Sequence, residues 1–232
     1  MRGNQMKPHP IISMVRSICK SYGVRFVLAR GIGSYMGLFC AEDKTLTVWT
    51  RYMRPRGRRQ GKTRVRATSQ VGILSTAIHE MTHMCQWRRR DPDWFARTDD
   101  GRRLDMMIFD YLSGDVGDHP RDLLLRSAMG QARLELEAEI TSLRIMDLFG
   151  VAYPRARTTR NAKAYAYSFV VFARTGIMAD KRMWSRWMPY ITNTWKFDLT
   201  DDILDKLCEI TRANPKLSFV IWDGNTCVKS TW

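Results

Sequence analysis

The chain has 232 residues, of which 44% are hydrophobic, and a formal net charge of +15, which is enough length for one large core or for a domain with a subdomain. Its five cysteines are scattered, odd in number and without C-x-x-C spacing, which excludes a disulfide framework and a four-cysteine zinc site. No run of 18 apolar residues occurs. We therefore expect a soluble, intracellular (cytoplasmic) protein without membrane insertion, and a virion interior would suit the same features.

The N-terminal part is expected to form a helix followed by a small sheet. Apolar residues at three- and four-residue spacing predict a helix over 10–22. Runs of β-forming residues predict strands over 24–28, 36–40 and 45–50, the last two joined as a hairpin through 41–44. An edge strand of such a sheet can pair with an extended peptide. The strand 45–50 is our candidate for that edge, although sequence does not determine strand order.

A basic segment, residues 51–66, follows these strands. It contains eight cationic residues and no acidic one: Arg51, Arg54, Arg56, Arg58, Arg59, Lys62, Arg64 and Arg66. Trp49 and Tyr52 lie near its start, where aromatic rings could stack on bases. We expect a loop that attracts DNA or RNA, with an affinity that falls steeply with salt. An acidic protein, a membrane surface, or a solvated loop that only aids solubility are the alternatives.

The next predicted helix, 69–90, carries the most informative motif. It reads H-E-x-x-H, with His79, Glu80 and His83. Residues four apart lie on one face of a helix, so the two imidazoles can share one Zn²⁺, and Glu80 can act as general base on the metal-bound water. The alternative is a pair of surface or core-edge histidines with ordinary hydrogen bonds. That alternative gives no reason for a glutamate at the second position.

A catalytic zinc needs a third protein ligand, and a second long helix is predicted to supply it. The seven residues after His83, from Met84 to Arg90, contain no histidine, which excludes the metzincin extension. Apolar spacing predicts a helix over 121–149, closed by Gly150. Glu135 and Glu139 border its apolar stripe. We predict that Glu135 is the third ligand and that Glu139 is a carboxylate that orients a ligand histidine.

Other acceptors for the third position stay open at this point. Glu139 is the main alternative to Glu135, and Asp147 and His119 are weaker ones. Glu137 is expected to point away from the metal. All three glutamates of the run 135–139 could also form a solvated acidic face, as charge runs on helices usually do.

With both motifs in place, the chain resembles the gluzincin branch of the zincin metallopeptidases. In several such families, H-E-x-x-H is followed by a helix that reads E-x-x-A-[DN], and positions 135–139 here read E-L-E-A-E. The resemblance implies that His79, His83 and Glu135 bind zinc and that Glu80 is the general base. Glu139 takes a place that Asp or Asn usually holds, which is a departure from the family pattern.

The expected fold class is α+β. Residues 1–150 would form a zincin-like core, which comprises an N-terminal helix, a small β-sheet, the H-E-x-x-H helix and the glutamate helix, and which includes the basic segment. Residues 151–232 would form a mainly helical subdomain. Further helices are predicted over 102–112, 161–176, 180–188 and 200–213, with a final strand over 217–222. Tyr165 and Tyr167 are candidates for stabilising an oxyanion, but core or interface positions suit them better.

The function expected from these features is that of a zinc metallopeptidase. It would hydrolyse a protein or peptide substrate, and its basic segment would recruit it to nucleic acid. The rival interpretation is a non-enzymatic nucleic-acid-binding or virion structural protein that keeps a zincin-like core. A small, basic protein with a lone zincin core is typical of what a phage or mobile element might carry. The sequence does not indicate an oligomeric state.

Overall fold

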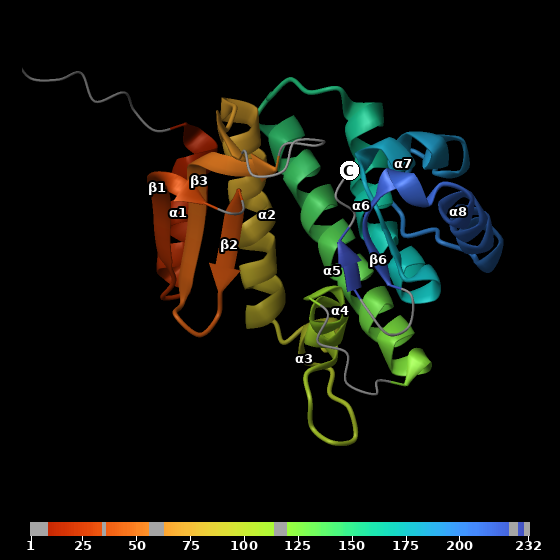
Figure 1. Cartoon of the computed structure of the whole chain (residues 1–232). Helices are drawn as coiled ribbons and strands as arrows, with labels where there is room; N and C mark the ends of the chain where they lie inside the picture. The colour runs from red at the N-terminus through yellow and green to blue at the C-terminus, as the bar shows by residue number, and fades with distance from the viewer. Residues whose placement is uncertain (1–8, 34–35, 56–62, 114–119, 223–226, 230–232) are drawn as a thin grey trace, which may run out of the picture. The chain divides into compact units, whose positions relative to one another are not determined.

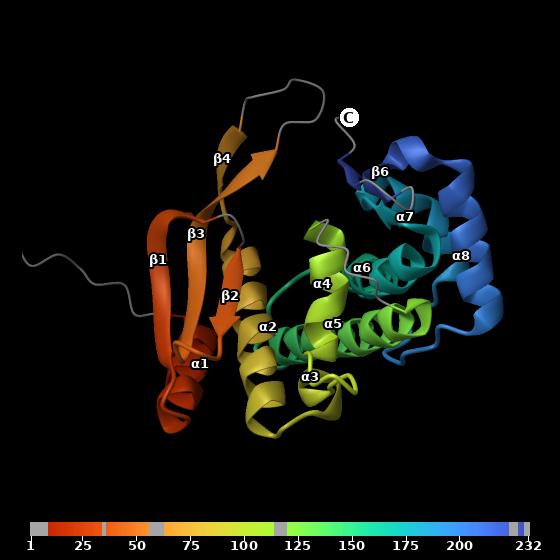
Figure 2. The same cartoon turned by 60° about the horizontal axis from the view of Figure 1, so that its bottom comes forward.

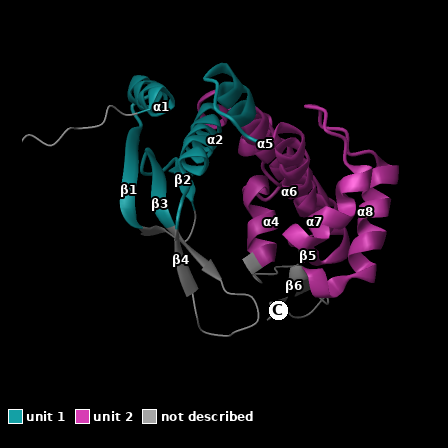
Figure 3. Cartoon of the chain, turned by 90° about the horizontal axis from the view of Figure 1, so that it is seen from above, with its two compact units in different colours: residues 1–56, 61–85, 141–153 teal, residues 57–60, 86–140, 154–232 magenta. Residues whose placement is uncertain are grey.

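The computed structural model describes residues 9–33, 36–55, 63–113, 120–222 and 227–229. It is an α+β protein, as predicted at this coarse level, with eight α-helices and two small sheets among these residues (Figure 1). The chain divides into two compact units (Figure 3). Unit 1 comprises 1–56, 61–85 and 141–153, and unit 2 comprises 57–60, 86–140 and 154–232. The predicted division into domains at residue 150 stays a prediction, because compactness does not show which part folds by itself.

Unit 1 begins with helix α1, Pro10–Ser21, close to its predicted bounds. Proline suits the first turn because its missing N–H would have no helical partner there. The ring of His9 caps the helix by accepting a hydrogen bond from the amide of Ile11 at 3.2 Å. The residues spaced for one face are buried: Ile11, Ile12, Val15 and Cys19. This face anchors the helix to the core of the unit.

The first sheet has the strand order β1-β3-β2 (Figure 2). Strand β1, Arg25–Gly33, runs parallel to β3, Thr45–Pro55, and β2, Gly37–Cys40, pairs antiparallel with β3. The predicted hairpin is therefore confirmed. The prediction that 45–50 forms the edge is wrong: this strand lies in the middle, and β2 lies at the edge. The physical reason is that β1 pairs with β3 in parallel across the whole hairpin, which no local pattern encodes.

The prediction of a loop over the whole basic segment is also wrong. Strand β3 continues to Pro55, and strand β4, Thr63–Ala67, pairs antiparallel with it. The stretch Thr63-Arg64-Val65-Arg66-Ala67 alternates charged with uncharged residues, which is the period of a strand. The high charge of this segment favoured a loop prediction over this alternation. Much of the segment is thus the two arms of a hairpin.

The two helices that carry the motifs agree with prediction. Helix α2 is Gln70–Arg88 and helix α5 is Arg121–Leu148, followed by Gly150 with φ of 66°. A glycine fits there because left-handed backbone carries no Cβ penalty for it. Between them lie the short helix α3, Pro92–Phe95, and helix α4, Leu104–Ser113, the latter as predicted.

Unit 2 has its core around helix α6, Arg155–Thr175. Helix α7, Lys181–Trp187, and helix α8, Asp201–Ala213, follow, and both were predicted. Two short 3₁₀ turns, Met188–Tyr190 and Pro215–Leu217, follow α7 and α8. A second sheet has the order β5-β6-β7, formed by Ile177–Ala179, Ser218–Trp222 and Cys227–Lys229.

Of these three strands, only β6 was predicted. Strands of three residues, such as β5 and β7, are too short to show a period of two.

Within the part of the chain that the structure describes, no helix has both the length and the hydropathy needed to cross a bilayer.

Candidate metal centre

The two motif histidines lie one turn apart on helix α2, and their rings converge. The Nε2 atoms of His79 and His83 are 3.0 Å apart, with the ring centroids 4.6 Å apart and the rings nearly perpendicular. His83 is buried, with 8% of its surface exposed, and His79 is half-buried. Zn–N bonds of about 2.0–2.1 Å in a tetrahedral site would place two such nitrogens about 3.3 Å apart. The observed spacing is close to what one shared metal ion requires.

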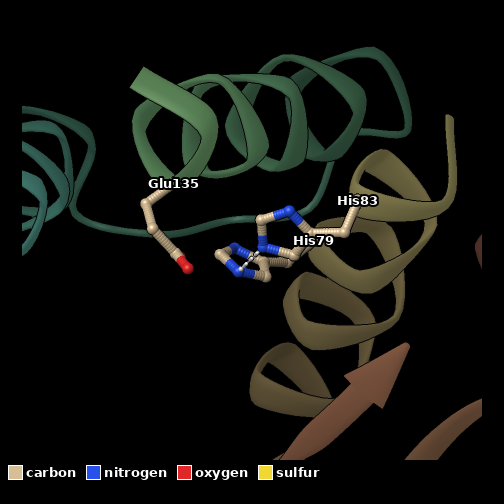
Figure 4. A group of neighbouring side chains, drawn as sticks. All are labelled: His79, His83 and Glu135. Atoms are coloured by element: carbon tan, nitrogen blue, oxygen red, sulfur yellow. Dashed lines mark hydrogen bonds between the residues drawn. The ribbon is translucent and has the colours of Figure 1, made fainter. Parts of the chain in front are cut away.

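Glu135 on helix α5 supplies the third ligand atom of the group (Figure 4). The side chain is buried, with 7% of its surface exposed, and its ligand oxygen and the two imidazole nitrogens all lie within 4.8 Å of one another. Within the described ranges, this is the group of three or more His, Cys, Asp or Glu residues that could hold a metal ion. Two nitrogens and one carboxylate oxygen form a donor set that borderline divalent cations prefer.

Hydrogen bonds between α2 and α5 fix how the two helices run beside each other. Ser142 donates its hydroxyl to the carbonyl of Ser75 at 3.3 Å, and Gln86 donates its side-chain amide to the carbonyl of Leu134 at 2.9 Å. Ser75 precedes Gln86 on α2, whereas its partner Ser142 follows Leu134 on α5. The two helices therefore run antiparallel. The three candidate ligand residues lie within the stretches of α2 and α5 that these two contacts delimit.

Glu80 lies between the two histidines in sequence but contacts the sheet. Its Oε2 accepts a hydrogen bond from the main-chain N–H of Phe39, in the edge strand β2, at 2.8 Å. The side chain is half-buried. A backbone donor of this kind stabilises the ionised carboxylate, which is the form that a general base needs.

Sequence reasoning missed Gln131. It lies one turn before Glu135 on the same helix, is buried, and donates its side-chain amide to Glu135 Oε1 at 2.6 Å. Such a donor orients a ligand carboxylate and fixes which oxygen faces the metal. The available signal was a glutamine four residues before the candidate ligand, which places it one turn earlier on the same face of the helix.

The other candidate acceptors differ in their placement. Glu137 accepts hydrogen bonds from Arg89 and Gln86, so its carboxylate is engaged with those two side chains. Glu139 is half-buried one turn after Glu135, and its orienting role stays a prediction. Asp147 is exposed near the end of α5. His119 lies outside the described residues.

The two tyrosines considered for an oxyanion role serve the packing of unit 2. The ring of Tyr165 packs edge-on against Phe169 and Trp184. Tyr167 is fully buried and donates its hydroxyl to Asp198 Oδ1 at 2.6 Å. Burial, and secondarily the carboxylate of Asp198, raise the pKa of this phenol. The interpretation as core aromatics is therefore the better one.

The predicted nucleic-acid-binding residues are described only in part. Arg51 is exposed on strand β3. Arg54, Arg64 and Arg66 are described through their backbone, with Arg54 opposite Arg64 and Tyr52 opposite Arg66 in the β3–β4 register. The remaining four, Arg56, Arg58, Arg59 and Lys62, lie outside the described residues.

Comparisons of the chain with protein-family models, with curated proteins and with solved structures give no match. What the chain does is therefore inferred from its own residues.

Proposed function

We propose that this protein is a zinc-dependent metallopeptidase of the gluzincin type. The observation that carries the proposal is the convergence of the His79, His83 and Glu135 ligand atoms, from two helices, with Glu80 next to the first histidine. A purely structural metal site has no need of that glutamate. Two histidines and one glutamate are a ligand set that catalytic zinc uses in peptidases, where a fourth position stays open for water or substrate.

The residues of the proposed site have two tasks, which are to hold the metal and to transfer a proton. When bound, zinc supplies Lewis acidity: it polarises a carbonyl and lowers the pKa of water. His79, His83 and Glu135 would hold it, and Gln131 would keep the Glu135 carboxylate oriented. Glu80 takes a proton from the attacking water and passes it to the leaving amine, which is general base and then general acid catalysis.

The sheet offers a place for an extended substrate. Strand β2 lies at the edge and next to Glu80, since the amide of Phe39 contacts that carboxylate. An extended peptide can add to an exposed sheet edge through its main chain. Strand β2 replaces 45–50 as the proposed peptide-binding edge, because the latter is enclosed by β1 and β2.

A second candidate, nucleic-acid binding, is favoured by the β3–β4 hairpin. Its register places Arg54 directly opposite Arg64, and Arg51 is exposed on the same hairpin. A high density of arginine in a short stretch attracts polyanions, with an affinity that falls as the salt concentration rises. The hairpin would then bring the peptidase to proteins bound to DNA or RNA. Without peptidase activity, the same feature would support a nucleic-acid-binding or virion structural protein.

The test compares the wild type with Glu80→Gln and His83→Ala. Metal content is measured by mass spectrometry, and hydrolysis is followed on labelled, unfolded casein. We expect about one zinc per wild-type chain. Glu80→Gln should keep the zinc but lose hydrolysis by roughly 10²–10⁴-fold, the usual contribution of a general base. His83→Ala should lose both.

Glu137→Gln is the matched control, since this glutamate lies two residues from Glu135 but contacts Arg89 and Gln86 instead. It should keep zinc and activity. Undiminished hydrolysis by Glu80→Gln would refute the proposed mechanism. A salt-dependent shift of nucleic acid that is indifferent to Glu80 and to chelators, without any hydrolysis, would favour the non-enzymatic candidate.

A further inference from the structure

The edge strand β2 lies unusually close to helix α2 at Gly37. A Cβ placed on this glycine would lie 2.7 Å from Cγ and 3.0 Å from Oε1 of Glu80, and it would clash still more closely with Cγ2 of Thr76. Real Cβ atoms essentially never approach other heavy atoms closer than 3.0 Å. The glycine is needed here for space, because any larger residue would force the side chains of Thr76 and Glu80, or the strand itself, to shift.

This close approach brings a main-chain donor to the carboxylate of Glu80. Trp49 donates its amide to the carbonyl of Met36 at 2.9 Å, which fixes the hydrogen-bonding alternation along β2. In an antiparallel pair, every second residue directs its N–H and C=O away from the partner strand. Phe39 is such a residue, and its N–H reaches Glu80 Oε2 at 2.8 Å.

We propose that strand β2 positions the general base: the missing Cβ at Gly37 and the amide of Phe39 together fix the carboxylate of Glu80. The inference rests on the proposed function, and it deepens it by identifying Gly37 as a positioning residue outside the H-E-x-x-H motif. The amide of Phe39 is then committed to the protein's own carboxylate rather than to the backbone of a substrate. One strand thus links the proposed peptide-binding edge to the orientation of the base.

The first experiment measures the contact without any activity assay. Hydrogen exchange of the Phe39 amide is followed by NMR in the wild type, Glu80→Ala and Gly37→Ala. Loss of one hydrogen bond corresponds to roughly tenfold faster exchange, so both variants should show about that increase at Phe39. Gly31→Ala is the matched control, because Gly31 lies in strand β1 of the same sheet and a Cβ there meets nothing within 4 Å.

The second experiment separates positioning from structure. Displacing a catalytic group by about 1 Å can cost about 10²-fold in rate, so Gly37→Ala should lower kcat by roughly 10–100-fold. Zinc content should not change, because His79, His83 and Glu135 are untouched. The double variant Gly37→Ala with Thr76→Ser removes the methyl group that makes the closest clash. It should recover part of the thermal stability that Gly37→Ala loses but not its kcat, because the 2.7 Å contact with Cγ of Glu80 remains.

Three results would overturn the inference. The Phe39 amide could exchange equally in the wild type and Glu80→Ala, which would show that the contact does not form in solution. Gly37→Ala could retain the kcat of Gly31→Ala. The double variant could recover kcat together with stability, which would make Gly37 a purely structural residue. A wild type that binds zinc but hydrolyses nothing would instead refute the proposed function, while the exchange data would still decide whether the contact exists.

Discussion

Two polar clusters in this protein, each with a buried charged or polar side chain, differ in where their positive charge comes from. In unit 2, Lys163 of α6 is fully buried and donates from Nζ to Thr192 Oγ1 at 2.8 Å, Thr194 Oγ1 at 3.1 Å and Asp198 Oδ1 at 2.7 Å. An ammonium group has three N–H donors, and these three acceptors use all of them. The chain thus supplies its own cation, and every donor of that cation has an acceptor within the cluster.

The His79–His83–Glu135 group has the opposite character. It gathers two imidazole nitrogens and a carboxylate oxygen, which are the atoms that bind metal cations. The comparison teaches that burial of polar groups alone does not mark a functional site. A cluster that contains its own counter-charge serves the structure, whereas a cluster of converging metal-binding atoms could hold a cation taken up from outside.

The largest effect on folding is expected from removing the internal cation. Lys163→Met should lower the free energy of unfolding by about 3 kcal/mol, because breaking a buried pair leaves the partner without its charge. This is the lower end of the usual range, since 28% of the Asp198 side chain is exposed. Urea unfolding, with and without zinc, measures it.

The loss in Lys163→Met should be the same in both zinc conditions if the two clusters are independent. Lys206→Met is the control, since Lys206 forms an exposed pair with Glu209 on α8 and should show no measurable change. A loss that disappears on adding zinc would contradict the separation of the two clusters.

The sequence predicted the long helices and the three residues that they bring together because the apolar patterns repeat over many turns. In α2 and α5 the apolar spacing extends over five turns or more, and the H-E-x-x-H pair lies inside such a pattern. The order of strands was not predictable, because the parallel pairing of β1 with β3 joins residues separated by the whole β2 hairpin. Strand β4 was not predicted because its alternating arginines are also typical of a charged loop.

Side-chain partners distant in sequence were equally inaccessible. Lys163 forms its cluster with a segment about 30 residues later, and nothing in the spacing of α6 indicates that a lysine is buried there. Phe39 meets Glu80 through its backbone, so its side chain carries no signal. Gln131 differs, because it is local to Glu135 and can be recognised once a buried ligand is suspected.

An effect of intermediate size, on zinc affinity, is expected from a substitution of Gln131. Gln131→Leu removes the donor to Glu135 Oε1 and should weaken zinc binding by about 10–100-fold, the usual cost of losing a group that orients a metal ligand. Competition with a chromogenic chelator measures it. Ser127→Ala is the control on the same helix, since its hydroxyl accepts from the amide of Ile108 and has no role at the metal. Equal zinc affinity in both variants would show that Gln131 is not needed to orient the ligand.

The smallest effect is a loss of stability in acid that belongs to the Lys163 cluster. Burial raises the pKa of Asp198, but the hydrogen bonds from Lys163, Thr192 and Tyr167 outweigh it, so the pKa lies below its ordinary value. The unfolded chain, with an Asp pKa of about 3.9, then binds more protons in acid than the folded one. The contribution of Asp198 is present above that pH and is lost as the pH falls towards the folded pKa. In the metal-free protein, the difference in unfolding free energy between the wild type and Asp198→Asn should be constant above about pH 5 and shrink below about pH 4. A difference independent of pH would mean that the charge of Asp198 contributes nothing, and the cluster would then hold together through its hydrogen bonds alone.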